Sequence, residues 1–286
     1  MKRFLIITNS YKDQKLKLTK EIKQYIEGKG GFCTYFESTG EEALNAAPEL
    51  DKIPEGIECV LVLGGDGTLI RAAARMVDYN IPLAGVNLGT LGYLCELEES
   101  TVFPAIDQLM EDTYIIEDRM MLSGYGIVQK NKVPEKVAFN DIVIHRTGSL
   151  SIVNLIVSVN GAYLNTFHGD GIIVSTPTGS TGYNMSAGGP IVDPKANMIL
   201  ITPINAHNLN SRSIVIGAED EVTIELGKRR AQKDETVEVS FDGDNAVKLE
   251  VGDKFVIRKA EKAAHICKTR KESFLEILRK KMQSYV

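Results

Sequence analysis

The feature that most constrains the fold of this chain is a change in its pattern near residue 119. Before that point, continuous apolar runs such as residues 59–63 (CVLVL) alternate with amphipathic segments such as residues 68–77. Alternating strands and helices imply a parallel sheet with right-handed crossovers. From about Met120 the chain has short strands in which apolar and polar residues alternate, which is typical of an antiparallel β domain. We therefore expect two domains, a number that suits 286 residues.

In the first part of the chain the pattern predicts both strands and helices. The expected strands are residues 4–8, 32–36, 59–63 and 81–86, and the expected helices are residues 14–27, 68–77 and 102–111. In the second part we expect strands at residues 155–159, 222–226, 237–241 and 248–251. The pairs Asn160-Gly161 and Asp242-Gly243 are strong hairpin signals between such strands.

Near the end, residues 273–282 turn helical again, and Ser273 with Glu276 makes a capping box. A lone helix does not belong in a β-sandwich, so we expect it to return to the first domain. The predicted domains are residues 1–119 with 266–286, and residues 120–265. We interpret the basic residues of this tail as a solvated helix face: Lys268, Arg270, Lys271, Arg279, Lys280 and Lys281.

Composition excludes several classes of protein. The net charge of −5 and the pI near 5.6 argue against general binding to nucleic acid or to anionic membranes. No apolar run reaches the roughly 18 residues of a membrane span, and none resembles a signal peptide. The four cysteines form no CxxC pair and no zinc spacing with the histidines. Buried free thiols are expected, which favours a cytoplasmic protein.

The first candidate site is the sequence Gly64, Gly65, Asp66, Gly67 and Thr68, between a buried strand and a helix. Open α/β sheets bind ligands at that position. Glycines let backbone N–H groups approach phosphates, and the helix N-terminus adds partial positive charge. A carboxylate beside phosphates is repelled, so Asp66 needs a role: to hold Mg²⁺, or to accept a proton from an acceptor hydroxyl. The alternative is a glycine-rich turn that Asp66 caps.

Two other phosphate-binding signatures are absent. The chain has neither G-x-x-x-x-G-K-[ST] nor a G-x-G-x-x-G after its first strand, so neither a P-loop enzyme nor a hydride-transferring dinucleotide fold is supported. Residues 87–94 (NLGTLGYL) also follow a strand. Their two glycines suggest a second loop over the same crevice, or an ordinary connection.

The densest signal is the run of residues 170–184 (DGIIVSTPTGSTGYN), which continues into residues 186–190 (SAGGP). Its hydroxyl groups suit sugar hydroxyls, amides and adenine edges, and Tyr183 can stack on a base. Asn140 and Asp141, at the start of another strand, would suit a ribose diol or form a turn. We interpret His168 and His207 as ordinary hydrogen-bonding residues.

Together these motifs resemble the ATP-NAD kinase family. The GGDGT sequence is shared with diacylglycerol and sphingosine kinases, whereas the run that starts at Asp170 is far more specific. The resemblance implies an α/β N-terminal Rossmann-like domain, an all-β (β-sandwich) C-terminal domain and a C-terminal helix that returns to the first. It implies transfer of the γ-phosphoryl group of ATP, or of polyphosphate, to the adenosine-ribose 2′-hydroxyl of NAD, which gives NADP.

The resemblance also implies roles for individual residues. Asp66 matches the catalytic carboxylate, with Gly67 as its neighbour on the phosphate side. The positions that match contacts to NAD are Tyr93, Leu94, Asn140, Asp141, Thr178, Thr181, Gly182, Tyr183 and Ser186. Asp170 matches a carboxylate that reaches NAD held by a neighbouring subunit, so we expect a homodimer or homotetramer. Many relatives have Ala where this chain has Gly182, which bears on fine substrate preference.

The resemblance implies a divalent cation, for which Mg²⁺ is expected. It has no dedicated protein site: it would come with the nucleotide, and Asp66 is its candidate ligand. Two alternatives stay open. A lipid kinase of the diacylglycerol type would share GGDGT but needs an apolar cleft. A non-catalytic NAD(H)-sensing module would keep the hydroxyl-rich run and have no use for Asp66.

Overall fold

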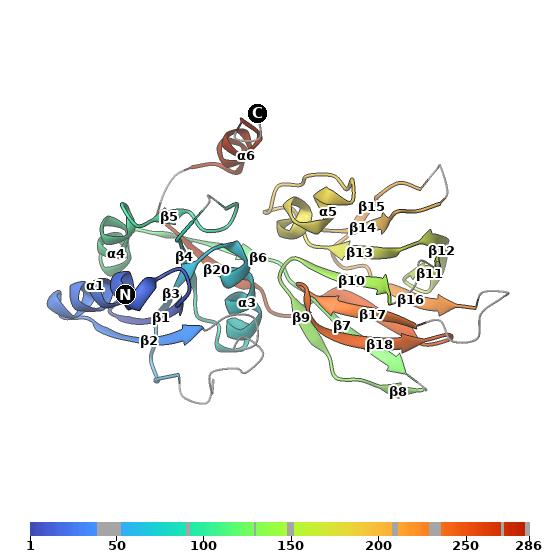
Figure 1. The fold of residues 1–286 in the computed structure, drawn as a ribbon, viewed down its shortest axis with the longest axis horizontal. Helices are drawn as coiled ribbons and strands as arrows, with labels where there is room; N and C mark the ends of the chain where they lie inside the picture. Colours follow the sequence, from blue (N-terminus) through green and yellow to red (C-terminus); the bar gives the residue numbers. More distant parts are fainter. Residues whose placement is uncertain are drawn as a thin grey trace. The chain divides into compact units, whose positions relative to one another are not determined.

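The computed structural model describes residues 1–38, 53–89, 92–128, 130–147, 152–207, 211–228, 236–269 and 272–283. Its contacts divide the chain into two compact units (Figure 1). One unit is Met1–Asp118 with Ala264–Val286, and the other is Arg119–Ala263. No helix of the described residues is both long enough and apolar enough to span a membrane.

The first unit is built on one mainly parallel sheet. Its strand order is β2 (Phe32–Ser38), β1 (Arg3–Asn9), β3 (Cys59–Gly64), β4 (Leu83–Asn87), β20 (Ala264–Lys268) and β6 (Ile115–Arg119), with β5 (Leu97–Glu98) paired to β4. The chain leaves β1 for β2 on one side and then crosses to β3 on the other. Strand order therefore reverses between β1 and β3, where an open α/β sheet has its ligand crevice.

Helices cover both faces of this sheet. Helices α1 (Lys17–Gly28) and α4 (Val102–Met110) share one apolar cluster with alternate residues of β1 and β3. Helix α3 (Asp66–Met76) buries Leu69 beside Gly85 of β4, which points to the other face, and a short 3₁₀ turn, η3 (Val77–Tyr79), follows it.

The structure divides the helix predicted at residues 14–27. A 3₁₀ turn, η1 (Gln14–Leu16), precedes α1, and Lys15 and Leu16 have left-handed φ angles of 58° and 56°. The cause is Asp13, whose carboxylate accepts hydrogen bonds from the N–H of Leu18 (3.0 Å), the N–H of Thr19 (2.9 Å) and the Thr19 hydroxyl (2.6 Å). This buried carboxylate satisfies the first N–H groups of α1 and so sets where the helix begins.

The second unit consists of two antiparallel sheets. One has the order β15 (Ile214–Gly217), β14 (Met198–Ile204), β13 (Gly171–Ser175), β10 (Asp141–Arg146), β17 (Thr236–Phe241) and β18 (Asp244–Glu250). The other has the order β12 (Ala162–Gly169), β11 (Val153–Val159), β16 (Val222–Gly227), β19 (Lys254–Lys259), β7 (Leu122–Val128) and β8 (Asn131–Lys132), with β9 (Lys136–Ala138) paired to β7. Side chains of both sheets share one core, including Ile142 and Ile172 from the first and Leu155 and Phe255 from the second. The unit is therefore a β-sandwich.

Both hairpin predictions are confirmed. Asn160 and Gly161 connect β11 to β12 with φ angles of 50° and 79°, and Asp242 and Gly243 connect β17 to β18 with φ angles of 51° and 84°. Two successive positive φ angles are those of a type I′ turn, whose twist matches the flanking strands.

The C-terminal segment joins the sheet of the first unit through one strand and then continues into a helix. Strand β20, which the sequence pattern did not indicate, pairs in parallel with β4, with Ile266 opposite Leu83. Helix α6 (Phe274–Gln283) then begins at the predicted capping box, in which the Ser273 N–H donates to Glu276 Oε2 (2.7 Å) and the Glu276 N–H donates to Ser273 Oγ (3.3 Å).

The interpretation of the basic tail as a solvated face was wrong for two of its residues. The Lys268 side chain is 11% exposed and Lys281 is 9% exposed, because both ammonium groups lie against other parts of the first unit. Arg279 and Lys280 are exposed as expected. Arg270 and Lys271 lie outside the described residues.

The cap at Asp13 leads to a stability prediction. Asp13→Ala removes an acceptor that serves two N–H groups at the start of α1, one of them on the buried Thr19. We expect it to lower the free energy of unfolding by about 1–2 kcal/mol in urea titrations. Glu21→Ala, on the exposed face of the same helix, is the control and should leave the midpoint unchanged. Equal midpoints for the two variants would contradict this role of Asp13.

Candidate active site

A cavity of about 400 Å³ lies at the predicted crevice of the first unit. The described residues that line it are Asn9, Lys12, Gly65, Asp66, Gly67, Thr68, Arg71, Gly92 and Lys281. Asn9 is the last residue of β1, Lys12 follows that strand, and Gly65 follows β3, so the carboxyl ends of the two strands at the reversal point supply its floor. The GGDGT sequence therefore occupies the position that the strand–helix pattern predicted for it.

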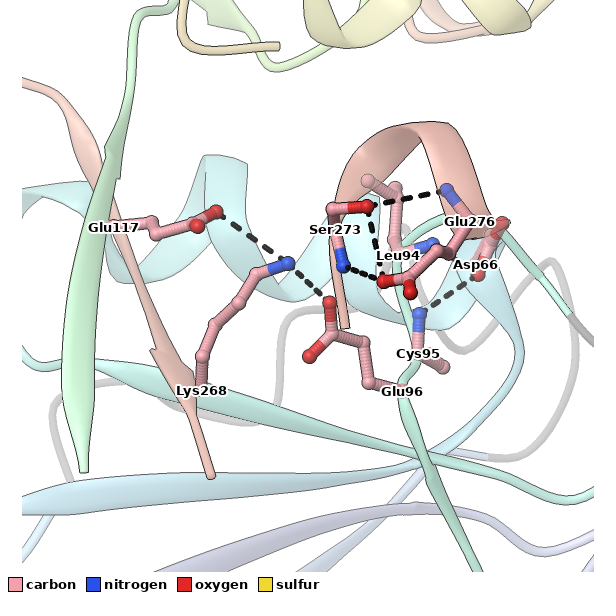
Figure 2. Close-up of polar contacts among 8 residues, drawn as sticks. All are labelled: Asp66, Leu94, Cys95, Glu96, Glu117, Lys268, Ser273 and Glu276. Atoms are coloured by element: carbon pink, nitrogen blue, oxygen red, sulfur yellow. Dashed lines mark hydrogen bonds and ion pairs between the residues drawn. The ribbon is translucent and has the colours of Figure 1, made fainter. Parts of the chain in front are cut away.

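The Asp66 carboxylate is held by the backbone of another loop. Oδ2 accepts the N–H of Tyr93 (2.6 Å), and Oδ1 accepts the N–H groups of Leu94 (3.2 Å) and Cys95 (3.1 Å). Figure 2 shows Asp66 beside Leu94 and Cys95, with the bond from Cys95 marked. The loop approaches so closely that a Cβ atom on Gly92 would overlap the Asp66 carboxylate. The direction of this carboxylate is therefore fixed before any ligand binds.

Three cations surround the same cavity. Lys12 Nζ lies between the two glycine loops, 2.9 Å from where a Cβ of Gly65 would stand and 3.4 Å from that of Gly89. Arg71 has a buried Nε with no hydrogen-bond partner among the described residues. The Lys281 ammonium lies 5.3 Å from the centroid of the Tyr93 ring. With the N-terminus of α3, three cations against one carboxylate suit a chain of phosphates.

Sequence reasoning missed these three cations. Arg71 lies four residues after Gly67 and three after Thr68 on α3, so helical spacing could have indicated it. Lys12 sits in a loop and Lys281 in a helix 215 positions beyond Asp66, and neither has a sequence signal that points to the crevice. Tertiary structure alone brings them to the cavity.

The described residues do not form a resident metal site. They contain no cluster of three or more His, Cys, Asp or Glu side chains. Among the described residues that line the cavity, Asp66 is the one acidic residue, and three N–H groups already contact its oxygens. A divalent cation held by protein needs more oxygen ligands than this.

The hydroxyl-rich run of the second unit forms a strand followed by helical turns. After β13 come η4 (Thr178–Thr181) and α5 (Tyr183–Ser186). Several of its polar groups hold the segment itself. Thr176 donates to the carbonyl of Phe139 (2.8 Å), Ser180 donates to that of Val192 (3.1 Å), and the Asn184 amide donates to that of Pro190 (3.0 Å).

Other groups of this unit are buried without a partner among the described residues. Asn140 Oδ1 and Thr178 Oγ1 are of this kind. Leaving such a group unsatisfied costs about 1–3 kcal/mol, so a ligand or an ordered water is expected to complete them. Gly182 lies beside them, since a Cβ there would be 3.5 Å from Asn140 Nδ2 and 4.0 Å from Asp141 Oδ2. The structure thus places Gly182 beside Asn140 and Asp141.

The remaining predicted contacts occupy more open positions. Tyr183 is 47% exposed at the start of α5, where its ring is accessible for stacking, and Ser186 is exposed in the same helix. The Thr181 hydroxyl donates to the Thr178 carbonyl at 3.4 Å.

Asp170 stands apart, because it precedes β13 whereas Thr178 follows it. Its two oxygens accept bonds from Arg146 Nε (2.7 Å) and Asn205 Nδ2 (2.8 Å), and these bonds, Asn205 first, lower the pKa of Asp170.

Asp242 is a second residue that sequence reasoning missed, since the pattern indicated only a turn there. Its carboxylate accepts the N–H groups of Phe139 (2.7 Å), Asn140 (2.7 Å) and Asp141 (3.1 Å), and so positions the Asn140-Asp141 pair. Burial, and to a lesser degree the charge of Asp242, raises the pKa of Asp141 to about 7. Burial raises the pKa of Asp242 to about 6, although the three N–H bonds oppose this.

A carboxylate fixed among cations and backbone amides, at the carboxyl ends of parallel strands, indicates the class of protein: an enzyme that handles phosphoryl groups. Comparisons with known proteins then identify the family. The model of the ATP-NAD kinase N-terminal domain matches residues 4–114, and that of the ATP-NAD kinase C-terminal domain matches residues 139–269. The chain belongs to the ATP-NAD kinase family and is a phosphotransferase.

Individual relatives agree with this assignment. The chain is 58% identical over 285 residues to an NAD kinase of Agathobacter rectalis, with 100% of both chains covered, and 41% identical over 294 residues to one of Lachnospira eligens, with 99% and 100% covered. Two solved structures share its fold at 22% identity. A yeast NADH kinase complexed with NADH has a TM-score of 0.83 over 98% of this chain and 87% of its own. An Archaeoglobus fulgidus NAD kinase in complex with ATP has a TM-score of 0.78 over 99% of both.

The close approach of Gly92 to Asp66 can be tested directly. Gly92→Ala places a methyl group where the Asp66 carboxylate lies, so one of the two must move. We expect turnover to fall by about tenfold to a hundredfold, since small misplacements of a reacting group cost that much. Gly28→Ala is the control, because its Cβ would have no neighbour within 4 Å. Wild-type turnover in Gly92→Ala would show that the carboxylate needs no fixed position.

The buried pair of acids predicts a pH dependence. The pKa of Asp141 is about 7 in the folded state, against an ordinary value of 3.8, so the folded state binds this proton more tightly than the unfolded state. The resulting stabilisation is complete below pH 3.8 and is lost as pH rises towards 7. The urea midpoint of the second unit should therefore be higher at pH 5 than at pH 8, and Asp141→Asn should shrink the difference. Asp193→Asn, at an exposed carboxylate, should keep the wild-type difference. An unchanged difference in Asp141→Asn would contradict the assignment.

Proposed function

We propose that this chain transfers the γ-phosphoryl group of ATP to the adenosine-ribose 2′-hydroxyl of NAD, which gives NADP and ADP. The observation that carries the proposal is the Asp66 carboxylate, fixed by three backbone N–H groups in a cavity with Lys12, Arg71 and Lys281. The names of the relatives and the ligands of the two neighbours, NADH and ATP, support the same substrates.

In the proposed reaction the cations and the N-terminus of α3 bind the phosphate chain of the donor. The 2′-hydroxyl oxygen attacks the γ-phosphorus, the bond from that phosphorus to the bridging oxygen breaks, and ADP leaves with the electron pair. Asp66 orients the hydroxyl and accepts its proton. Since phosphoryl transfer has a loose transition state, positioning and charge neutralisation outweigh base strength, and a carboxylate held in one direction suits that requirement.

The second domain supplies the proposed binding groups for NAD. Asn140 and Thr178 have unsatisfied buried oxygens, and Asp141 lies beside Gly182, so these residues suit the hydroxyl and amide groups of a dinucleotide. The exposed Tyr183 ring offers a stacking surface. Tyr93 and Leu94, which hold Asp66 through their backbone, are proposed to line the adenosine pocket. Asp170 is proposed to reach NAD bound to a neighbouring subunit, in a homodimer or homotetramer.

Among the described residues that line the cavity, Asp66 is the one acidic side chain, and a divalent cation, proposed to be Mg²⁺, would enter with the nucleotide. Its chemistry there is to neutralise phosphate charge. A phosphate chain without a base satisfies the same cationic groups, so inorganic polyphosphate is a second proposed donor. We place the enzyme in the cytoplasm, since all four cysteines are free and buried.

Neither alternative function fits the cavity as well. A lipid kinase needs apolar side chains beside the phosphate site, and the described lining residues include none. A sensing module has no use for an acid held by three N–H groups among cations.

The deciding assay incubates the purified protein with Mg²⁺ and NAD plus either ATP or polyphosphate, and measures NADP. Labelled ATP with diacylglycerol is the parallel arm, and label in lipid without NADP would overturn the proposal.

Asp66→Asn tests the proposed role of the carboxylate. The amide keeps the shape but accepts no proton, and we expect turnover to fall about 10²–10⁴-fold. NAD binding, measured by calorimetry, should be retained because its proposed contacts lie mainly elsewhere. Glu111→Gln, an exposed change of the same kind in the first domain, should keep wild-type turnover. Full turnover in Asp66→Asn would remove Asp66 from the mechanism.

A further inference from the structure

We propose that Lys281, near the end of the C-terminal helix α6, binds the terminal phosphates of the phosphoryl donor. This inference rests on the proposed function, because it assigns one more residue to the donor cavity. It replaces the interpretation of α6 as a solvated basic helix with a role for its inner face in the enzyme's site.

The position of Lys281 on α6 is the first argument. Lys281 is 9% exposed, whereas the side chain of its neighbour Lys280 is 53% exposed and pairs with Glu272 at the surface. Burying an ammonium group is costly unless negative charge or aromatic surface compensates it. The Tyr93 ring, at 5.3 Å, and Asp66, in the same cavity, provide part of this compensation. The ammonium group also belongs to the lining of the cavity, where an anionic ligand would contact it.

The charges of the cavity are the second argument. Among the described residues that line it, Lys12, Arg71 and Lys281 contribute three positive charges and Asp66 contributes one negative charge. This excess of cations in the lining favours an anionic ligand, and the terminal phosphates of a polyphosphate chain are such a ligand. Lys281 comes from helix α6 at the C-terminal side of the sequence, whereas Lys12 comes from the loop after β1.

The anchoring of the segment before α6 is the third argument. Lys268, at the end of β20, forms ion pairs with Glu96 and with Glu117 (3.4 Å), and the three side chains are 11%, 11% and 14% exposed (Figure 2). Glu96 follows Cys95, whose N–H holds Asp66. The same ion triad therefore ties the strand that leads into α6 to the loop that positions Asp66. Further along, the capping box of Ser273 and Glu276 starts the helix.

The test compares Lys281→Gln with Lys280→Gln, which removes the same charge from the adjacent, exposed position of the same helix. Calorimetry with inorganic tripolyphosphate measures the phosphate site without a base, and steady-state kinetics measure KM for ATP and for NAD. We expect Lys281→Gln to weaken tripolyphosphate binding and raise KM for ATP by about tenfold or more, with KM for NAD unchanged. Lys280→Gln should match the wild type, and Lys281→Arg should restore most of the binding.

Equal tripolyphosphate affinity in Lys281→Gln and Lys280→Gln overturns the inference. If Lys281→Gln does not fold, as judged by circular dichroism, Lys281→Met takes its place, since it keeps the buried apolar stem. The two proposals fail separately. A wild type that makes no NADP overturns the proposed function, while the tripolyphosphate measurement still decides the role of Lys281.

Discussion

The interaction on which the site depends is the contact between the Asp66 carboxylate and the backbone N–H groups of residues 93–95. It joins the first residue of α3 to the segment before β5, and it sets the direction of the acid before substrate arrives. Gly92 is required for the approach, because any side chain there would occupy the place of the carboxylate. A preorganised group of this kind costs no rearrangement during the reaction, which is why positioning can outweigh intrinsic base strength.

The cations around this acid come from three separate parts of the chain. Lys12 follows β1, Arg71 belongs to α3, and Lys281 belongs to α6. Strand β20 makes the last of these possible, because it adds the end of the chain to the first sheet beside β4. The Glu96–Lys268–Glu117 ion triad then ties that strand to the Asp66 loop. Strand β20 therefore extends the first sheet and also positions the segment that carries Lys281 to the phosphate cavity.

The second domain uses its polar groups in two distinct ways. Thr176, Ser180 and Asn184 satisfy backbone groups of their own segment, while Asn140 and Thr178 keep buried oxygens available. From sequence alone, all these hydroxyls and amides look alike, since the difference depends on which carbonyl lies within reach after folding. The same holds for Asp242, which looks like a turn residue and in addition holds the backbone of Asn140 and Asp141.

By itself the sequence determined the two-domain division, the parallel and antiparallel sheets, the type I′ hairpins, the start of α6 and the position of GGDGT. These features follow from periodicity and from residues whose local conformation is intrinsic, such as glycine in turns and serine at helix starts. Tertiary structure alone decided which charged residues meet: Lys281 and Lys12 in the cavity of Asp66, and Lys268 between two glutamates. The physical reason is that a long charged side chain has no preferred local environment, so its role depends on which distant segment the fold places beside it.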